Sequence, residues 1–247
     1  MKKLILMIGT VVTMMTATTA KAQDDKMLFN HLSAGISIGI LDGIGVEVAT
    51  PCTDYVNVRA GFSGLPFPSI TVKDVEVSGD SKKESVDLKT KVKKTDFKLL
   101  FDVHPFKSSS FRVTLGAYIG NSEFLTAENE NQMTDYSNKY IKIGDHKIGF
   151  DKNGYTKASI KVNSFRPYAG IGFGRAISRN NKWVCNFDLG CQFWGTPKVY
   201  GYDIKDKVFQ EIKAEDIDNE DGKEAMEWIS KVKVCPTLSF RVVYNIF

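Results

Sequence analysis

The last thirteen residues of the chain alternate between apolar and polar side chains. The even positions from Leu238 to Ile246 are apolar, and polar residues stand at the odd positions Thr237, Ser239, Arg241 and Asn245. A period of two belongs to a β-strand whose two faces meet different surroundings. Because the pattern runs to a terminal aromatic residue, Phe247, it is typical of a strand in a membrane-spanning barrel.

The first 22 residues have the pattern of a secretory signal peptide. A basic start, Met1–Lys3, precedes an apolar core, Leu4–Met15, and a small-residue cleavage site at Ala20-Lys-Ala22. The apolar core is shorter than the roughly 20 residues of a spanning helix. No cysteine follows the cleavage site, which argues against a lipoprotein anchor. Cleavage removes three lysines and no acids, so the net charge falls from +4 to +1 and no nucleic-acid partner is indicated.

The remaining chain, residues 23–247, is predicted to form a single outer-membrane β-barrel domain. About 225 residues fit one domain. They contain no apolar stretch of about 18 residues, so no transmembrane helix is expected. A secreted chain without such a helix enters a membrane only as a closed barrel, because lipid cannot satisfy an open sheet edge.

Period-two patterning predicts eight strands in all. They are expected near residues 31–41, 44–50, 55–62, 96–104, 111–119, 165–173, 183–193 and 235–247. Asp42-Gly43 is expected to form a two-residue hairpin turn. The fold class is therefore all-β, an eight-stranded antiparallel up-and-down transmembrane β-barrel. A soluble barrel of the lipocalin type is the alternative, with its apolar faces turned inward.

The connections between these strands alternate in length. Apart from the tight turn at Asp42-Gly43, three long polar segments at about 63–94, 121–161 and 198–231 alternate with short turns near Cys52, Lys107 and Asn180. This asymmetry is typical of outer-membrane barrels, whose long loops are extracellular. The three segments lack steady alternation and are expected to be exposed, protease-sensitive loops.

Several short phrases follow one another in an order that resembles a known family. They are Gly43–Glu47, Asn57–Gly61, Asp102–Phe106, Phe111–Gly116, Pro167–Gly174, Phe187–Gly190, Gly195–Val199 and Pro236–Phe240. Together they resemble small bacterial outer-membrane barrels of the OmpA/OmpX/OmpW kind, and are most similar to a group of uncharacterised barrels. In one departure, Asn245 stands where such families usually carry a tyrosine, with Tyr244 one position earlier. The resemblance implies a fold and a location in the outer membrane of a Gram-negative bacterium, but no reaction.

Charged residues of both signs fall on the faces predicted to point into the barrel. This lumen charge network comprises Glu47, Arg59, Asp96, Lys98, Asp102, Arg112, Asp188 and Arg241. An eight-stranded barrel leaves room for side chains and little else, and an unpaired buried charge is costly. We therefore expect the charges to pair across the lumen as a plug; an ion or proton path is the alternative.

No catalytic or metal site is expected. His31, His104 and His146 are spread along the chain without an obvious nucleophile and acid beside them. Cys185 and Cys191 share a strand face about 20 Å apart, far beyond the reach of a disulfide. The acidic segment from Asp216 to Glu227 has part of the spacing of a calcium loop, but a solvated loop is the preferred interpretation.

Aromatic residues near the strand ends are candidates for interfacial girdles. They are Trp183, Trp194, Tyr200, Tyr168 and Tyr244, of which Tyr168 has an inward register.

The sequence thus predicts a structural or interaction role, with polar loops presented at the cell surface. A narrow channel for a small hydrophobic compound, as in OmpW-type barrels, is the alternative, and a lipid-modifying enzyme is a third possibility. Expected partners are outer-membrane lipid, lipopolysaccharide and the barrel assembly machinery. No cofactor is expected, and the sequence names no extracellular ligand.

Overall fold

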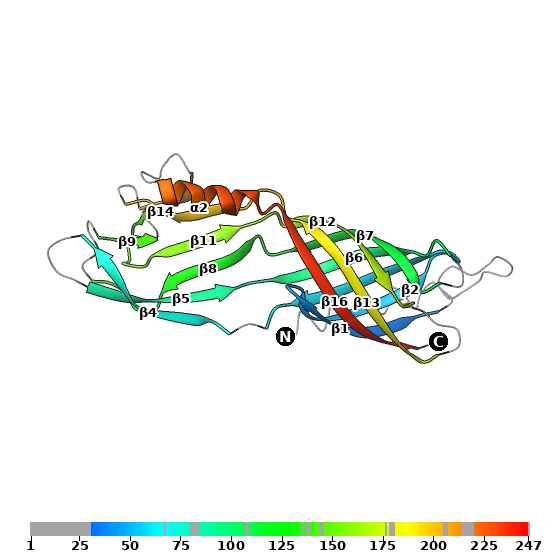
Figure 1. Ribbon diagram of the computed structural model, residues 1–247. Coiled ribbons are helices and arrows are strands. Elements are labelled where there is room, and N and C mark those ends of the chain that lie inside the picture. The colour runs from blue at the N-terminus through cyan, green and yellow to red at the C-terminus, as the bar shows by residue number, and fades with distance from the viewer. Residues whose placement is uncertain are drawn as a thin grey trace.

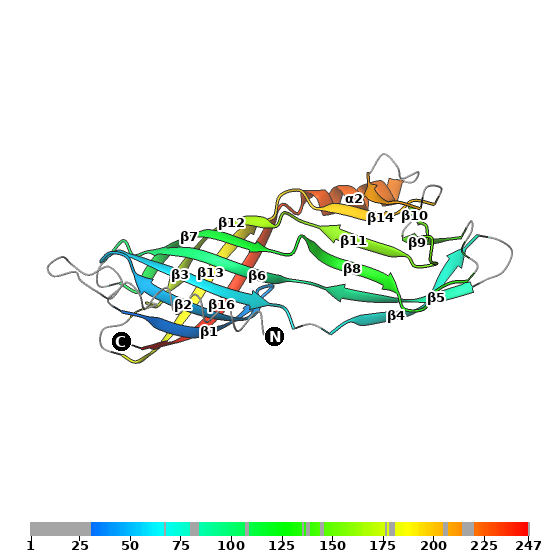
Figure 2. The ribbon, with the colours of Figure 1, turned by 180° about the vertical axis from the view of Figure 1, so that it is seen from behind.

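The protein consists of a closed β-barrel and a second β-sheet that follow one another along one long axis (Figures 1 and 2). The computed structural model describes residues 31–66, 68–79, 84–106, 109–134, 136, 139–143, 146–175, 177, 181–204, 207–213 and 220–246. The predicted signal peptide lies outside these residues. Within them, no helix is long and apolar enough to cross a membrane.

Eight antiparallel strands close the barrel, in the order β1-β16-β13-β12-β7-β6-β3-β2. Their bounds are β1 (Ser33–Ile40), β2 (Gly43–Pro51), β3 (Val56–Gly64), β6 (Thr95–Val103), β7 (Phe111–Gly120), β12 (Phe165–Phe173), β13 (Trp183–Phe193) and β16 (Val234–Asn245). Pairing of β1 with β16, from Ser33↔Asn245 to Ile40↔Leu238, joins the two ends of the sheet. The predicted all-β class and eight-stranded antiparallel barrel are confirmed.

The predicted turn at Asp42-Gly43 lies slightly earlier in the chain. Strand β1 ends at Ile40 and β2 begins at Gly43, so the turn consists of Leu41 and Asp42. Leu41 and Gly43 both have positive φ angles, 64° and 71°. Glycine adopts this left-handed conformation without a steric penalty, whereas Leu41 pays one. The shift turns the buried side chain of Asp42 toward the barrel interior, where it accepts hydrogen bonds.

The two faces of each barrel strand differ sharply in polarity. In β6 the odd positions Phe97, Leu99 and Phe101 are exposed, while the even positions from Asp96 to Asp102 are buried. The outward residues of all eight strands form an apolar belt, which includes Ile36, Ile38, Val46, Phe62, Phe101, Leu115, Ile171, Leu189 and Phe240. Apolar side chains outside and charged side chains inside reverse the order of a soluble protein.

The three predicted long loops are not irregular, because they contain all eight strands of a second sheet. Its order is β10-β9-β4-β5-β8-β11-β14-β15. The strands are β4 (Ile70–Ser78), β5 (Glu84–Val92), β8 (Glu123–Asn129), β9 (Tyr140–Ile143), β10 (His146–Ile148), β11 (Lys157–Lys161), β14 (Lys198–Tyr202) and β15 (Phe209–Ile212). The prediction that these segments are loops was wrong where they form these strands, and their exposure to protease stays a prediction.

The second sheet extends the barrel hairpins beyond the barrel. Figure 2 shows β5 running on into β6, and β7 into β8, along the long axis. The sheet also curls, since the amide of Gly149, just after β10, donates a hydrogen bond to the carbonyl of Tyr202 at the end of β14 (2.9 Å). The curled sheet therefore has an inner and an outer face.

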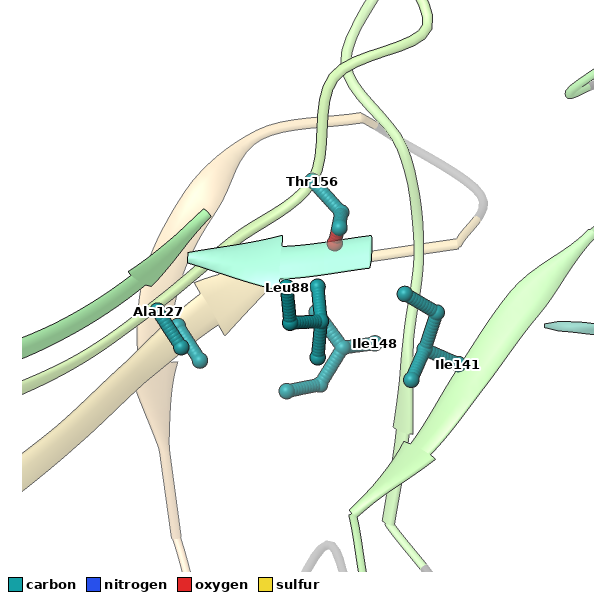
Figure 3. Close-up of a pocket in the computed structure, with 6 residues that line it drawn as sticks. Leu88, Ala127, Ile141, Ile148 and Thr156 are labelled. Atoms are coloured by element: carbon teal, nitrogen blue, oxygen red, sulfur yellow. The ribbon is translucent and has the colours of Figure 1, made fainter. Parts of the chain in front are cut away.

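The inner face of the second sheet is apolar. Val77, Leu88, Met133, Ile141 and Phe150 form a buried cluster there. Figure 3 shows the small hollow that remains beside this cluster, lined by Leu88, Ala127, Ile141, Ile148 and Thr156, with Ala158 completing the wall. Its volume is about 10 Å³, which corresponds to about one water molecule. The second sheet thus has a packed core of its own.

The outer face of the second sheet carries partly exposed ion pairs. Lys157 lies 3.2 Å from Glu123 and 3.8 Å from Glu128, and Lys161 lies 3.7 Å from Glu123. Partial burial raises the pKa of Glu123, but the hydrogen bond and charge of Lys157 outweigh it, so that pKa lies below its usual value. Exposed pairs of this kind contribute at most about 1 kcal/mol each.

One helix, α2 (Glu220–Lys231), occupies the end of the third long segment and contacts β14. Sequence analysis expected only loop here. The residues 214–219, which hold the start of the proposed calcium loop, lie outside the described residues. At the end of α2, Glu227 and Lys231 form an exposed ion pair (3.3 Å).

Two of the five girdle candidates lie on the outward face at one end of the barrel, and their place at a membrane interface stays a prediction. Trp183 and Tyr244 lie side by side on the outward face at the barrel end far from the second sheet, with ring centroids 4.9 Å apart. Trp194 is buried with Val162 and Cys235 at the junction of the two parts, and Tyr200 belongs to the second sheet. Tyr168 lies inside the barrel, as its register indicated.

We expect the belt to contact lipid, and Leu115→Arg tests this. Leu115 is 51% exposed near the middle of β7, so an arginine there would cost about 2–4 kcal/mol in a bilayer. The measurement is urea-induced unfolding in vesicles, followed by the mobility of unheated samples in SDS gels. Leu115→Ala is the matched control and should cost less. Wild-type stability of Leu115→Arg would contradict lipid contact.

Candidate functional site

The barrel interior is the candidate site, because it gathers most of the charged residues predicted to lie there. Seven of the eight form one continuous set of contacts, contributed by β2, β3, β6, β7, β13 and β16; they are Glu47, Arg59, Lys98, Asp102, Arg112, Asp188 and Arg241. All seven are buried. We call this set the central network.

Each carboxylate of the central network contacts at least two cations. Glu47 lies 2.7 Å from Lys98, 3.1 Å from Arg59 and 3.4 Å from Arg241. It therefore joins three strands besides its own, β3, β6 and β16.

Asp188 is the second junction of the network. Its oxygens lie 2.6 Å from Arg112, 2.8 Å from Arg241 and 3.4 Å from Arg59. Three arginines thus depend on one carboxylate, and they come from β7, β16 and β3.

Asp102 completes the set through a two-point contact. Arg59 reaches its two oxygens from Nε (2.7 Å) and Nη2 (2.8 Å). The hydroxyl of Thr114 donates to the same carboxylate (2.7 Å), and Arg112 lies 3.5 Å away. Only the Nη2 contact is a hydrogen bond, so the Nε atom contributes through its charge at close range.

The eighth predicted residue, Asp96, belongs to a separate group nearer the second sheet. It pairs with Arg166, and Lys94 lies 3.5 Å from it. Lys94 also contacts Asp42 (2.9 Å). We call Asp42, Lys94, Asp96 and Arg166 the mouth group.

Asp42 is the acceptor at the centre of the mouth group. Besides Lys94, it receives hydrogen bonds from the Tyr118 hydroxyl (3.1 Å) and the Gln192 side-chain amide (2.8 Å). Sequence analysis assigned Asp42 to a turn and Lys94 to a loop, so it missed both. The signal for Lys94 was its position, since it stands two and four residues before the inward Asp96 and Lys98.

The charges nearly cancel within each group. The central network holds four cations and three carboxylates, and the mouth group holds two of each. Burying a charge without a partner costs several kcal/mol, and close opposite charges offset that cost. These groups link seven of the eight barrel strands, all except β1, and can hold them in register. Their charges are paired with one another.

Glycines on the inward faces make room for the large side chains. A Cβ atom on Gly172 would lie 2.8 Å from the Arg112 guanidinium, and one on Gly190 would lie 2.3 Å from the Tyr168 hydroxyl. The Tyr168 ring also packs against Tyr118, with centroids 5.4 Å apart. An eight-stranded barrel is just wide enough for side chains. Here glycines stand opposite long side chains and leave the space that these side chains fill.

The structure does not bring the three histidines together. His31 precedes β1 and His104 follows β6, with β2 and β3 between them in the barrel. His146 belongs to β10 in the second sheet. Among the described side chains, no group of three or more His, Cys, Asp or Glu residues is placed to hold a metal ion.

The four cysteines are unpaired. Cys185 is exposed in the belt and Cys191 half-buried, whereas Cys235 is buried at the junction of barrel and second sheet. The expectation that these cysteines form no disulfide framework agrees with this arrangement.

Comparison with solved structures finds similar proteins, two of which are from one organism. CarO2 of Acinetobacter baumannii is 17% identical over 89% of this chain and 100% of its own, with a TM-score of 0.50. CarO of the same organism is 18% identical over 90% of this chain and 99% of its own, with a TM-score of 0.48. No family model and no curated protein matches the sequence.

The fold is that of a small eight-stranded β-barrel, and it is similar to the fold of CarO2. At this identity the likeness to CarO2 concerns the fold alone.

We expect Asp188→Asn to destabilise the barrel strongly. The change leaves Arg59, Arg112 and Arg241 without a shared carboxylate, and breaking a buried ion pair costs about 3–5 kcal/mol. Urea unfolding of the refolded protein in detergent micelles measures the loss. The matched control is Glu128→Gln, which neutralises an exposed carboxylate and should change stability by less than about 1 kcal/mol. Equal effects of the two changes would contradict a structural role of the network.

Proposed function

We propose that the protein lies in the outer membrane of a Gram-negative bacterium and presents its second sheet at the cell surface. The apolar belt and the fold support the membrane location. The expected signal peptide supports export across the inner membrane. Lipid around the belt, and assistance from the barrel assembly machinery during insertion, follow from this proposal.

One observation carries the proposed role: the two parts of the protein have interiors of opposite character. The barrel is filled by paired charges, with Arg112 and Asp102 fully buried at its centre. The second sheet is filled by apolar side chains around Ile141 and Phe150. A plugged barrel bearing an independently packed sheet is suited to holding that sheet in place, which is a structural or interaction role.

The alternative role is a narrow channel for a small hydrophobic compound. Such a compound would need an apolar route along the axis. The apolar hollow beside Leu88 (Figure 3) has room for about one water molecule. Beyond it lie the mouth group and the central network, whose ionised groups disfavour apolar solutes. These features support presentation over transport.

An enzymatic role receives the least support. Nucleophilic catalysis needs a nucleophile within hydrogen-bond reach of a base that a third group orients. His31 precedes β1 and His104 follows β6, with β2 and β3 between these strands, and His104 is buried. The proposal is therefore non-enzymatic and involves no cofactor.

Surface labelling of intact cells tests the proposed orientation. Lys73, in β4, is an exposed residue of the second sheet, and Cys52 lies in the turn between β2 and β3 at the other end of the barrel. A maleimide that cannot cross the outer membrane should label Lys73→Cys in a Cys52→Ser background. In the wild-type protein it should label Cys52 only after the cells are permeabilised.

The opposite pattern would overturn the proposal. Labelling of Cys52 in intact cells, with Lys73→Cys protected, would place the second sheet in the periplasm.

A further inference from the structure

One flank of helix α2 is apolar, exposed and close to the belt of the barrel. Ala225, Trp228 and Val232 follow one another at spacings of three and four residues, so they share one side of the helix and its last turn. Trp228 is 64% exposed and Val232 is 50% exposed. The amide of Val232 donates to the carbonyl of Ile229, which continues the helical turn to this residue.

This flank continues the apolar belt. Figure 1 shows α2 (orange) joining β16 (red) where the barrel meets the second sheet. Val234, the first residue of β16, is 40% exposed and pairs with Phe193 of β13, which is 45% exposed. An apolar stripe thus runs from the barrel surface onto the helix.

The stripe stays close to the edge of the belt. Trp228 to Lys231 spans about 5 Å of helix, and the next three residues add at most about 10 Å. Trp228 therefore lies within about 15 Å of Val234 along the chain. A barrel embedded up to Val234 would bring this flank to the headgroup layer.

Two amines accompany the aromatic ring. The Nζ atom of Lys231 lies 6.0 Å from the centroid of the Trp228 ring, and Lys233 is exposed two residues later. Glu227 pairs with Lys231 at the surface (3.3 Å), a contact that solvent weakens. The half-buried residues Met226 and Ile229 occupy another side of the helix, while the exposed Glu224 lies one turn before Trp228 on the same side. The ring of Trp228 and the side chain of Lys233 are exposed, and the amine of Lys231 is shared with Glu227.

We propose that this flank binds the sugar–phosphate headgroups of lipopolysaccharide in the outer leaflet. Val232 and Val234 lie against the upper acyl region, and Trp228 packs on a sugar ring, since an aromatic residue with a polar N–H suits an interface that is wet at one end. Lys231 and Lys233 pair with phosphates through charge-assisted hydrogen bonds. The inference rests on the proposed outer-membrane location and adds a specific lipid contact to it.

Hydrogen exchange of the full-length protein tests the inference. The wild-type protein is placed in nanodiscs of lipopolysaccharide and, separately, of zwitterionic phosphatidylcholine. Amides of residues 223–233 should exchange about tenfold more slowly with lipopolysaccharide, because binding opposes local opening of a helix with few contacts. Amides of β5 and β8, in the second sheet, should exchange equally in both.

Three variants identify the groups responsible. Trp228→Ser and the double change Lys231→Gln, Lys233→Gln should each remove most of the slowing, whereas Trp228→Phe should keep most of it. The matched control is Lys73→Gln, which removes one exposed lysine from β4 and should change nothing. Slowing that survives both of the first two changes would overturn the assignment of the site.

The outcome also separates this inference from the proposed function. If β16 is protected in both nanodiscs but α2 exchanges equally in both, the barrel is in the membrane and only the lipopolysaccharide contact is wrong. If the protein enters neither nanodisc, the proposed location fails and the inference fails with it.

Discussion

Mutual neutralisation of buried charges is the constraint on which the barrel depends. An eight-stranded barrel has an interior that its own side chains must fill, and in this protein the strands fill it with ionised groups. Glu47 and Asp188 each contact three cations from different strands. Because each carboxylate ties several strands together, the register of one strand fixes that of its neighbours. The same contacts occupy the space through which a solute would pass.

The second sheet is filled with apolar side chains, although its strands continue hairpins of the barrel. From Leu88 through Lys94 to Lys98, the even positions of β5 and β6 face the interior throughout. Leu88 and Val92 in the second sheet are apolar, whereas Lys94, Asp96 and Lys98 at the mouth and in the barrel are charged. The chain thus changes which kind of residue it turns inward without changing its alternation. Trp194 and Val162 lie between the two interiors, where one kind of filling gives way to the other.

This change explains which features the sequence could predict. The barrel strands were predicted to within a few residues, since exposed Leu99 and Phe101 alternate with buried Lys98 and Asp102. In the second sheet the same rule fails, because Leu88 and Ile141 are buried and the side chain of Lys89 is partly exposed. Short strands with this reversed polarity resemble polar loops. The girdle prediction for Trp194 was wrong for a related reason. Its position near a strand end suggested a girdle, but its side chain is buried with Val162 and Cys235.

The candidate site, too, could be predicted only in part from the sequence, for physical reasons. Alternation placed eight charged residues on inward faces, but it could not show that Asp96 pairs with Arg166 and Lys94 and stands apart from the central network. Asp42 enters the interior through a backbone turn with Leu41 at positive φ, which no side-chain pattern indicates.

Conductance in planar lipid bilayers tests most directly whether the ion pairs close the barrel. The wild-type protein, refolded and inserted at defined orientation, should give no stepwise current in concentrated potassium chloride, since salt screens buried pairs much less than exposed ones. The control is the same preparation containing a known open porin, which must conduct. Regular, ohmic current steps from the wild-type protein would show an open lumen and contradict the account.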